Sequence, residues 1–397
     1  MSRNVFDGNQ VTLRDIPDLI KFAQRHNKAL YIMAGFGVGK SETVKQVANV
    51  LFGKREDNLI DIRLSDKEPT DVVGVQIPYT DDKGVTRSAY ATPSFWPTDP
   101  DWKGIIFLDE LAHAEPYLQK VAFQILLDHR IGEFVFPKGA VYVSAGNRQG
   151  DGGVVNDLEP GLANRVIMVE VKVSLEVWLE DYALLNGVHP SLIGYLKSKP
   201  SALDNYGEMM AAGSPSFASP RSVVTVSMAL KDYDKGILTQ RLTKTIIQGC
   251  VGKAFMEELW VFHTKRSKLT PIQHIMDGSV TNYMGTISAD ILWMIGSEGC
   301  MVLRSEIMDD ELSDEVVLEH AKNFLEYLHS NFGEENADFV SSVFMSFIKK
   351  NAFGEALLTG NNKRSGLPAK MLSQCPAMKE VMMKYISDYS TIVKDVN

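Results

Sequence analysis

A glycine-rich loop followed by Lys-Ser is the feature that most constrains this chain. The segment AGFGVGKSET, residues 34–43, follows the apolar run ALYIMA and precedes a stretch whose apolar residues recur at helical spacing. A strand, a glycine loop and a helix that begins at Lys-Ser form the setting in which such a loop binds phosphate. The glycines let backbone N–H groups converge on phosphate oxygens, and the helix N-terminus adds the positive end of a dipole. We therefore predict a nucleotide-binding loop.

The residue types in the loop indicate their roles toward ATP and Mg²⁺. Lys40 is expected to reach the β and γ phosphates, and the Ser41 hydroxyl to ligate Mg²⁺. Ala34 stands where the first glycine of the motif is usual, and alanine is small enough for the end of a strand. The predicted nucleotide-binding positions in this loop are Gly35, Phe36, Gly37, Val38, Gly39, Lys40, Ser41 and Glu42.

A second segment supplies carboxylates. In KGIIFLDELAHA, residues 103–114, four apolar residues are followed by Asp109 and Glu110. A buried parallel strand that ends in two carboxylates can hold Mg²⁺ and activate water at the edge of a sheet. Asp109 is predicted to hold the metal, directly or through water, and Glu110 to polarise the attacking water. The alternative is an acidic helix N-terminus after a core strand.

A third apolar run, AVYVSAGNR at residues 140–148, ends at Asn147. A neutral amide at the edge of the sheet could hydrogen-bond the γ-phosphate or the attacking water. A single Asn after a strand is more often a turn residue. Because it follows a third strand of the same kind, we predict a catalytic role for Asn147.

The pattern along the chain predicts four parts. Residues 1–15 are expected to form an N-terminal arm. Apolar runs alternate with helical patterns over 16–172, which predicts a three-layer α/β domain with a largely parallel sheet. Residues 173–270 are helical in pattern and predict a lid, and 271–397 predict a further helical domain.

Two hairpins are expected within the α/β domain. The first, VQIPYTDDKGVTRSAYA at residues 75–91, alternates around a turn, and the second is RIGEFVFPKGAVYV at residues 130–143. In the second, Phe134 and Phe136 could either touch a substrate or pack in the core.

These motifs occur in the order found in AAA+ ATPases. The phosphate loop, FLDELAHA, SAGN and LANRV (162–166) together resemble the MoxR-like branch, close to the magnesium-chelatase and dynein-related ATPases. DVVGV (71–75) is similar to the segment of that branch that precedes an insert. VWLEDYALLNGVHPSLIGYLKSKP (177–200) and ASPRSV (218–223) are similar to its helical lid. The resemblance covers most of the chain.

The resemblance assigns a function to each motif residue. Lys40 and Ser41 match the Walker A residues, and Asp109 and Glu110 the Walker B pair. Asn147 matches sensor 1.

The resemblance also implies two functional arginines. Arg165 matches the arginine finger, which completes the site of the neighbouring subunit, and Arg221 matches sensor 2. Both suit the role because a guanidinium is always charged and donates in a forked geometry. Arg148 is a rival for the finger. Arg165 could also be a surface arginine before the strand VIMVEV, and Arg221 could be an ordinary residue of the N-terminal turn of a helix. His113 lies where many relatives carry a basic or amide residue, and we expect a hydrogen-bonded surface histidine.

The activity implied is that of an ATP-hydrolysing homo-oligomeric ring, a hexamer, that remodels or matures a protein partner. That partner is expected to be a separately encoded protein with a von Willebrand factor A domain. Two alternatives stay open: a nucleic-acid motor, and an ATP-binding scaffold with little turnover. The net charge of -9 weighs against a protein whose whole surface tracks nucleic acid.

Cysteine usage and hydropathy predict a cytoplasmic protein. The three cysteines, Cys250, Cys300 and Cys375, are widely spaced without a CxxC motif, which indicates neither zinc nor a disulfide framework. No apolar run approaches the roughly 18–20 residues of a membrane helix, and the N-terminus MSRNVFDGNQ lacks the apolar core of a signal peptide.

Overall fold

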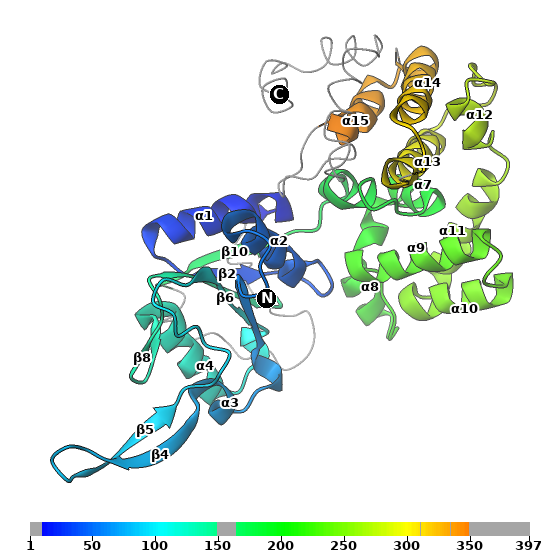
Figure 1. Ribbon diagram of the computed structural model, residues 1–397. Helices are drawn as coiled ribbons and strands as arrows, with labels where there is room; N and C mark the ends of the chain where they lie inside the picture. Colours follow the sequence, from blue (N-terminus) through cyan, green and yellow to red (C-terminus); the bar gives the residue numbers. More distant parts are fainter. Residues whose placement is uncertain (1–9, 149–163, 310, 334, 349–397) are drawn as a thin grey trace. The chain divides into compact units, whose positions relative to one another are not determined.

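A computed structural model describes residues 10–148, 164–309, 311–333 and 335–348. The chain divides into two compact units, Met1–Val173 and Ser174–Asn397 (Figure 1). The finer division expected from the sequence, at 15, 172 and 270, stays a prediction. Among the described residues, no helix is both long enough and apolar enough to cross a bilayer.

A six-stranded parallel sheet forms the centre of the first unit. Its order is β1-β10-β2-β9-β6-β3, and every neighbouring pair is parallel. The strands are β1 (Gln10–Val11), β2 (Leu30–Met33), β3 (Leu59–Arg63), β6 (Lys103–Asp109), β9 (Gly139–Gly146) and β10 (Ile167–Val171). The central strands are buried along most of their length, as expected of parallel strands covered on both faces. The predicted α/β class with a parallel sheet is confirmed.

Helices cover both faces of this sheet. Helices α1 (Ile16–His26) and α2 (Lys40–Phe52) lie on one face, and α4 (Pro116–Phe123) lies on the other (Figure 1). A short helix, α3 (Pro69–Val73), packs against α4. The core under α4 combines its apolar side with Ile106 and Leu108 of β6. Parallel strands place their carboxyl ends at one edge, so the segments that follow β2, β6 and β9 meet there.

The first predicted hairpin is confirmed, and the second forms only over residues 130–135, because residues 139–143 belong to β9 of the parallel sheet. Strands β4 (Val75–Thr80) and β5 (Thr86–Ala91) pair antiparallel, as do β7 (Arg130–Ile131) and β8 (Phe134–Val135). Phe136 is buried against Trp96 and Tyr142, with ring centroids 4.8 and 6.2 Å away. The core-packing explanation therefore holds for Phe136.

Part of the expected N-terminal arm lies in the sheet. Gln10 and Val11 pair with Glu170 and Val171 as the edge strand β1. Two residues are too few to show the alternation by which a strand is recognised in a sequence. Residues 1–9 lie outside the described part.

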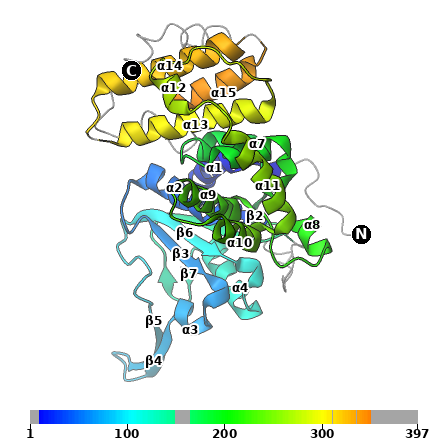
Figure 2. The same ribbon diagram turned by 90° about the vertical axis from the view of Figure 1, so that its right-hand side faces the viewer.

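Every regular element described in the second unit is a helix. Helix α7 (Pro190–Ser198) packs against α11 (Lys253–Arg266) and α13 (Ala289–Met308), and α9 (Pro220–Asp234) packs against α10 (Gln240–Val251). Helices α12 (Ile272–Met276), α14 (Asp314–Phe332) and α15 (Ala337–Ile348) gather around α13 (Figure 2). The remaining α-helices described there are α6 (Leu175–Trp178) and α8 (Tyr206–Ala211), and two short helical segments of other types are η5 (Leu179–Ala183) and η6 (Pro200–Leu203). Cys300 is buried and Cys250 half-buried, whereas Cys375 lies outside the described residues.

Candidate nucleotide site

The glycine loop turns sharply between β2 and α2. Gly37 and Gly39 have φ values of 65° and 110°, a region that side chains rarely adopt. Gly39 caps α2, and its carbonyl accepts a hydrogen bond from the Thr43 amide at 2.9 Å. A Cβ at Gly39 would lie 3.6 Å from Leu13, an ordinary contact, so the backbone conformation and not crowding requires glycine.

The Lys40 ammonium is held where the loop and β9 meet. Its Nζ donates to the carbonyls of Ala34 and Gly35 and to Oδ1 of Asn147, each at 3.1 Å. Gly146 precedes Asn147, and a Cβ there would collide with the Tyr31 hydroxyl. The small residue thus allows β9 to approach β2 closely just before Asn147. Two residues predicted from separate motifs are thereby in contact.

Ser41 and Asp109 form a second pair. The Ser41 hydroxyl donates to Oδ2 of Asp109 at 2.7 Å, and Oδ1 of Asp109 accepts from the Glu110 amide at 2.8 Å. Asp109 is only 6% exposed. Adjacent hydroxyl and carboxylate oxygens are ligands that Mg²⁺ uses, so the residues present fit this ion.

Asp61 is a further carboxylate beside this pair that sequence reasoning missed. It lies on β3, one strand from Asp109. Burial raises the pKa of Asp61, and the negative charge of Asp109 raises it further. The nearby charges of Arg63 and Lys45 lower it.

Glu110 has an unusual backbone and a partner on the next strand. Its φ is 57°, in the left-handed region, where it begins the turn Leu111–His113. Its carboxylate lies 3.6 Å from Nε of Arg63 and accepts a hydrogen bond from the Ser65 hydroxyl. Arg63 pairs with Asp109 at the end of β3, so strand register places it beside Glu110. Sequence reasoning missed both partners; the only signal was the polar end of LIDIRLS at the same sheet edge.

The three candidate arginines have different surroundings. Arg148 lies 3.5 Å from Glu170 of β10, and its side chain is 29% exposed. Arg165 is exposed in the turn before β10. Arg221 is exposed in the first turn of α9, after the cap at Ser219. It belongs to the second unit, so its role in the nucleotide site stays a prediction.

The expectation for His113 is wrong. The residue is half-buried, and its Nδ1 is buried with no hydrogen-bond partner among the described residues. The turn around it buries Leu111, Ala112 and Ala114, which draws the imidazole inward with them.

Comparison with known proteins yields distant structural likenesses. The chain matches no protein-family model and no curated protein. A chain of Hsp104, solved in a closed state with ATPγS and casein, is similar at 19% identity and a TM-score of 0.32, over 44% of this chain and 36% of that one. A putative ATPase of Cytophaga hutchinsonii is similar at 14% identity and a TM-score of 0.30, over 66% of this chain and 92% of that one. A RuvB variant of Thermotoga maritima is similar at 12% identity and a TM-score of 0.33, over 67% of this chain and 75% of that one.

These neighbours are AAA+ P-loop ATPases. At such identities and TM-scores, the function has to be argued from the site itself. The chain spans little more than a third of the length of the Hsp104 chain.

Proposed function

We propose that this protein is an ATP-hydrolysing AAA+ ring protein of the MoxR-like type, which uses ATP to remodel or mature a protein partner. One observation carries the proposal. Lys40 contacts Asn147, Ser41 contacts Asp109, and Glu110 adjoins them, all at the carboxyl edge of one parallel sheet. Three separate motifs thus supply a cation, a metal-binding oxygen pair and a carboxylate at one place.

Each group has a defined task in phosphoryl transfer. Lys40 and the amides of residues 35–42 bind the β and γ phosphates. Ser41 and Asp109 hold Mg²⁺, which when bound neutralises charge on the phosphate oxygens. Asn147 donates its amide N–H to the γ-phosphate or the attacking water. Glu110 orients and polarises that water.

The contacts of Glu110 make its task conditional. Arg63 and Ser65 both engage the carboxylate, so its oxygens are turned toward β3. To polarise a water molecule at the γ-phosphate, Glu110 has to leave these partners.

Completion of the site by a neighbouring subunit fits the arginines. Arg165 is exposed, whereas Arg148 is paired with Glu170 of its own sheet. Arg165 is therefore the better candidate to reach another subunit's γ-phosphate, and a closed ring, a hexamer, would repeat this contact. Arg221 would add a second guanidinium as sensor 2.

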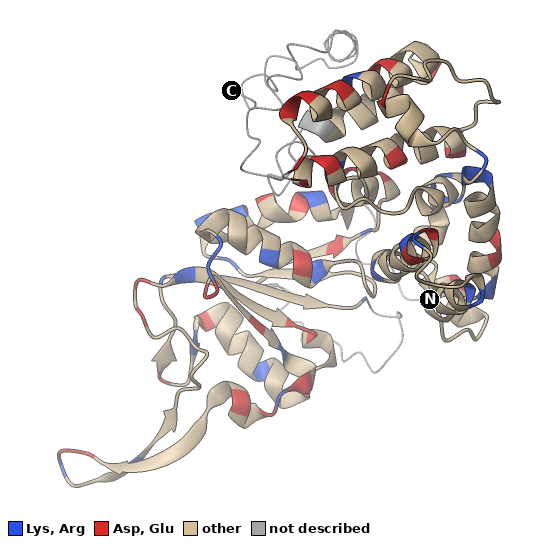
Figure 3. Ribbon diagram, turned by 45° about the vertical axis from the view of Figure 1, so that its right-hand side comes forward, with Lys and Arg blue, Asp and Glu red and all other residues tan. Residues whose placement is uncertain are grey.

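The partner we propose is a protein carrying a von Willebrand factor A domain, in preference to nucleic acid. Over the described residues, Lys and Arg are interspersed with Asp and Glu along the ribbon, without the continuous basic stripe of a backbone-tracking protein (Figure 3).

The experiment that tests the proposal is ATP turnover per subunit against protein concentration, with Mg²⁺ and no partner. A rate per subunit that rises with concentration supports sites shared between subunits. A measurable rate independent of concentration would remove Arg165 from its role. Stimulation by DNA at physiological salt would instead favour the nucleic-acid motor.

A further inference from the structure

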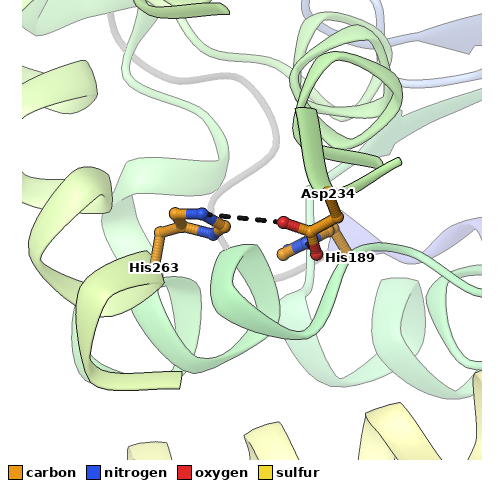
Figure 4. Close-up of side chains that lie close together, drawn as sticks. All are labelled: His189, Asp234 and His263. Carbon is orange, nitrogen blue, oxygen red and sulfur yellow. Dashed lines mark hydrogen bonds and ion pairs between the residues drawn. The ribbon is translucent and has the colours of Figure 1, made fainter. Parts of the chain in front are cut away.

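The second unit contains a cluster of two buried histidines and a more exposed aspartate that the nucleotide site does not use. His189 precedes α7, Asp234 ends α9, and His263 lies on α11 (Figure 4). His189 is 1% exposed and His263 is 7% exposed. Nε2 of His189 lies 3.0 Å from Oδ2 of Asp234, and Nε2 of His263 lies 3.6 Å from Oδ1.

One ring nitrogen of His189 accepts a hydrogen bond and the other donates one. Its Nδ1 accepts a hydrogen bond from the Ser191 amide at 3.2 Å, which makes His189 the N-cap of α7. A backbone N–H can only donate, so Nδ1 carries no proton. The single proton of the neutral ring is therefore on Nε2, where it donates to Asp234.

This arrangement leaves His189 no free nitrogen for a second proton or for a metal ion. Protonation of Nδ1 would set two donors, the ring N–H and the Ser191 N–H, against each other. A metal ion on Nε2 would likewise drive the ring proton to Nδ1. In both cases α7 loses the hydrogen bond that caps its first turn.

His263 differs in this respect. Its Nδ1 lies 3.4 Å from the Ser191 hydroxyl, which can rotate to accept or to donate. A second proton on His263 therefore breaks no backbone hydrogen bond, and the residue serves as an internal comparison.

The charged groups around the cluster come from three helices. Asp234 belongs to α9, and Arg266 of α11 donates to Asp234 at 2.6 Å and to Glu298 of α13 at 2.6 Å. From the same helices, the Ser227 hydroxyl accepts the His189 amide, and the Tyr233 ring lies 5.4 Å from that of His263. The cluster thus connects α7, α9, α11 and α13.

We propose that His189 is an acid-sensitive cap: neutral, it joins α7 to Asp234, and when it takes up a proton it releases the first turn of α7. Burial lowers the pKa of His189 to about 4, with the Arg266 charge acting in the same direction and Asp234 opposing it. Burial also lowers the pKa of His263.

The direction of the pH effect follows from these shifts. The folded-state pKa of His189 is below the ordinary value of 6.5, so the unfolded chain binds more protons between these two values. The stability of this region is therefore fully present above about pH 6.5 and falls as the pH drops toward 4.

The test is hydrogen–deuterium exchange of the full chain at about pH 7 and about pH 5, corrected for the intrinsic pH dependence of exchange. Protection of the peptide covering 189–198 should fall on the order of tenfold at the lower pH, relative to helix Pro116–Phe123 of the other unit. His189→Asn is the informative variant, because asparagine caps helices well and does not titrate. In His189→Asn, the protection of residues 189–198 should change little between the two pH values. In His263→Asn, the same peptide should still lose protection at the lower pH.

Several results would overturn the proposal. These are equal acid responses in wild type and His189→Asn, a response lost only in His263→Asn, or protection of 189–198 that rises when Zn²⁺ is added at neutral pH. A measurement on the wild-type chain does not depend on any variant folding: nitrogen-15 NMR of labelled histidines should show His189 protonated on Nε2 alone, with no titration near its ordinary pKa. A ring protonated on Nδ1 at neutral pH would contradict the inference.

Discussion

Lys40 and Asn147, 107 residues apart in the chain, are joined by a hydrogen bond of 3.1 Å from Nζ to Oδ1. The contact connects the phosphate loop to the end of β9. It also fixes how the Asn147 amide is turned, because the oxygen faces Lys40 and the NH₂ group is left to donate elsewhere.

Asn147→Ala should therefore separate binding from hydrolysis. The Lys40 ammonium keeps its two carbonyl partners in the loop, so ATP affinity should change by less than about threefold. Turnover should fall roughly 10²-fold or more, because a donor to the reacting groups is lost. Lys40→Ala is the comparison and should lose ATP binding itself. Equal losses of affinity in both variants would contradict the assignment, and titration with a fluorescent ATP analogue beside a phosphate-release assay measures both.

Release of Glu110 from β3 should raise the basal rate. Arg63→Ala removes an ion pair with Glu110 whose two side chains are 57% and 39% exposed. Breaking such a pair costs at most about 1 kcal/mol, so its removal is expected to raise turnover by at most roughly fivefold. Arg87→Ala is a matched control, because its side chain is also 57% exposed and it pairs with Asp81 on the hairpin. A lower rate in Arg63→Ala than in Arg87→Ala would show that Arg63 assists the reaction.

Mixing variants tests whether sites are shared. Arg165→Ala should bind ATP and lose hydrolysis, and an equal mixture with Lys40→Ala should regain some turnover because the two defects lie on different subunits. Arg148→Ala mixed with Lys40→Ala serves as the control, since Arg148 is paired with Glu170 of its own sheet. If turnover recovered in the mixture that contains Arg148→Ala but not in the mixture that contains Arg165→Ala, Arg148 would be the arginine that acts on the neighbouring subunit.

Asp234 should stabilise the second unit in a pH-dependent way. Burial alone would raise its pKa, but the hydrogen bond from His189 and the charge of Arg266 outweigh burial and lower the pKa to about 2. This contribution is fully present above the ordinary pKa of 3.8 and is lost as the pH falls toward 2. Asp234→Asn should lower the melting temperature at neutral pH by several degrees. In strong acid the melting temperatures of the variant and the wild type should become equal. Asp232→Asn, on the same helix, is the control, and an equal effect there would contradict the prediction.

The parts of the site that could be predicted are those encoded locally. The glycines at 37 and 39 indicate the turn, and the apolar runs before Asp109 and Asn147 indicate strands that end at one edge. Because these strands are parallel, their carboxyl ends lie at the same edge of the sheet, and the motifs that follow them meet there.

The missed features depend on contacts between distant segments. Arg63 meets Glu110 only because β3 and β6 pair in one register, and no short motif encodes that register. The cluster around His189 joins residues from separate helices, each of which would be unremarkable alone. His113 was misjudged because its polar side chain suggests a surface position, whereas its apolar neighbours decide where the turn lies.

At Glu110, the stability of the fold and the proposed chemistry favour different residues, because the backbone there is left-handed. A side chain in this conformation costs about 1 kcal/mol, whereas glycine adopts it freely. Glu110→Gly would therefore relieve strain in the fold while removing the carboxylate that is to activate water. Selection of this chain for thermal resistance alone would favour an inactive protein at this position.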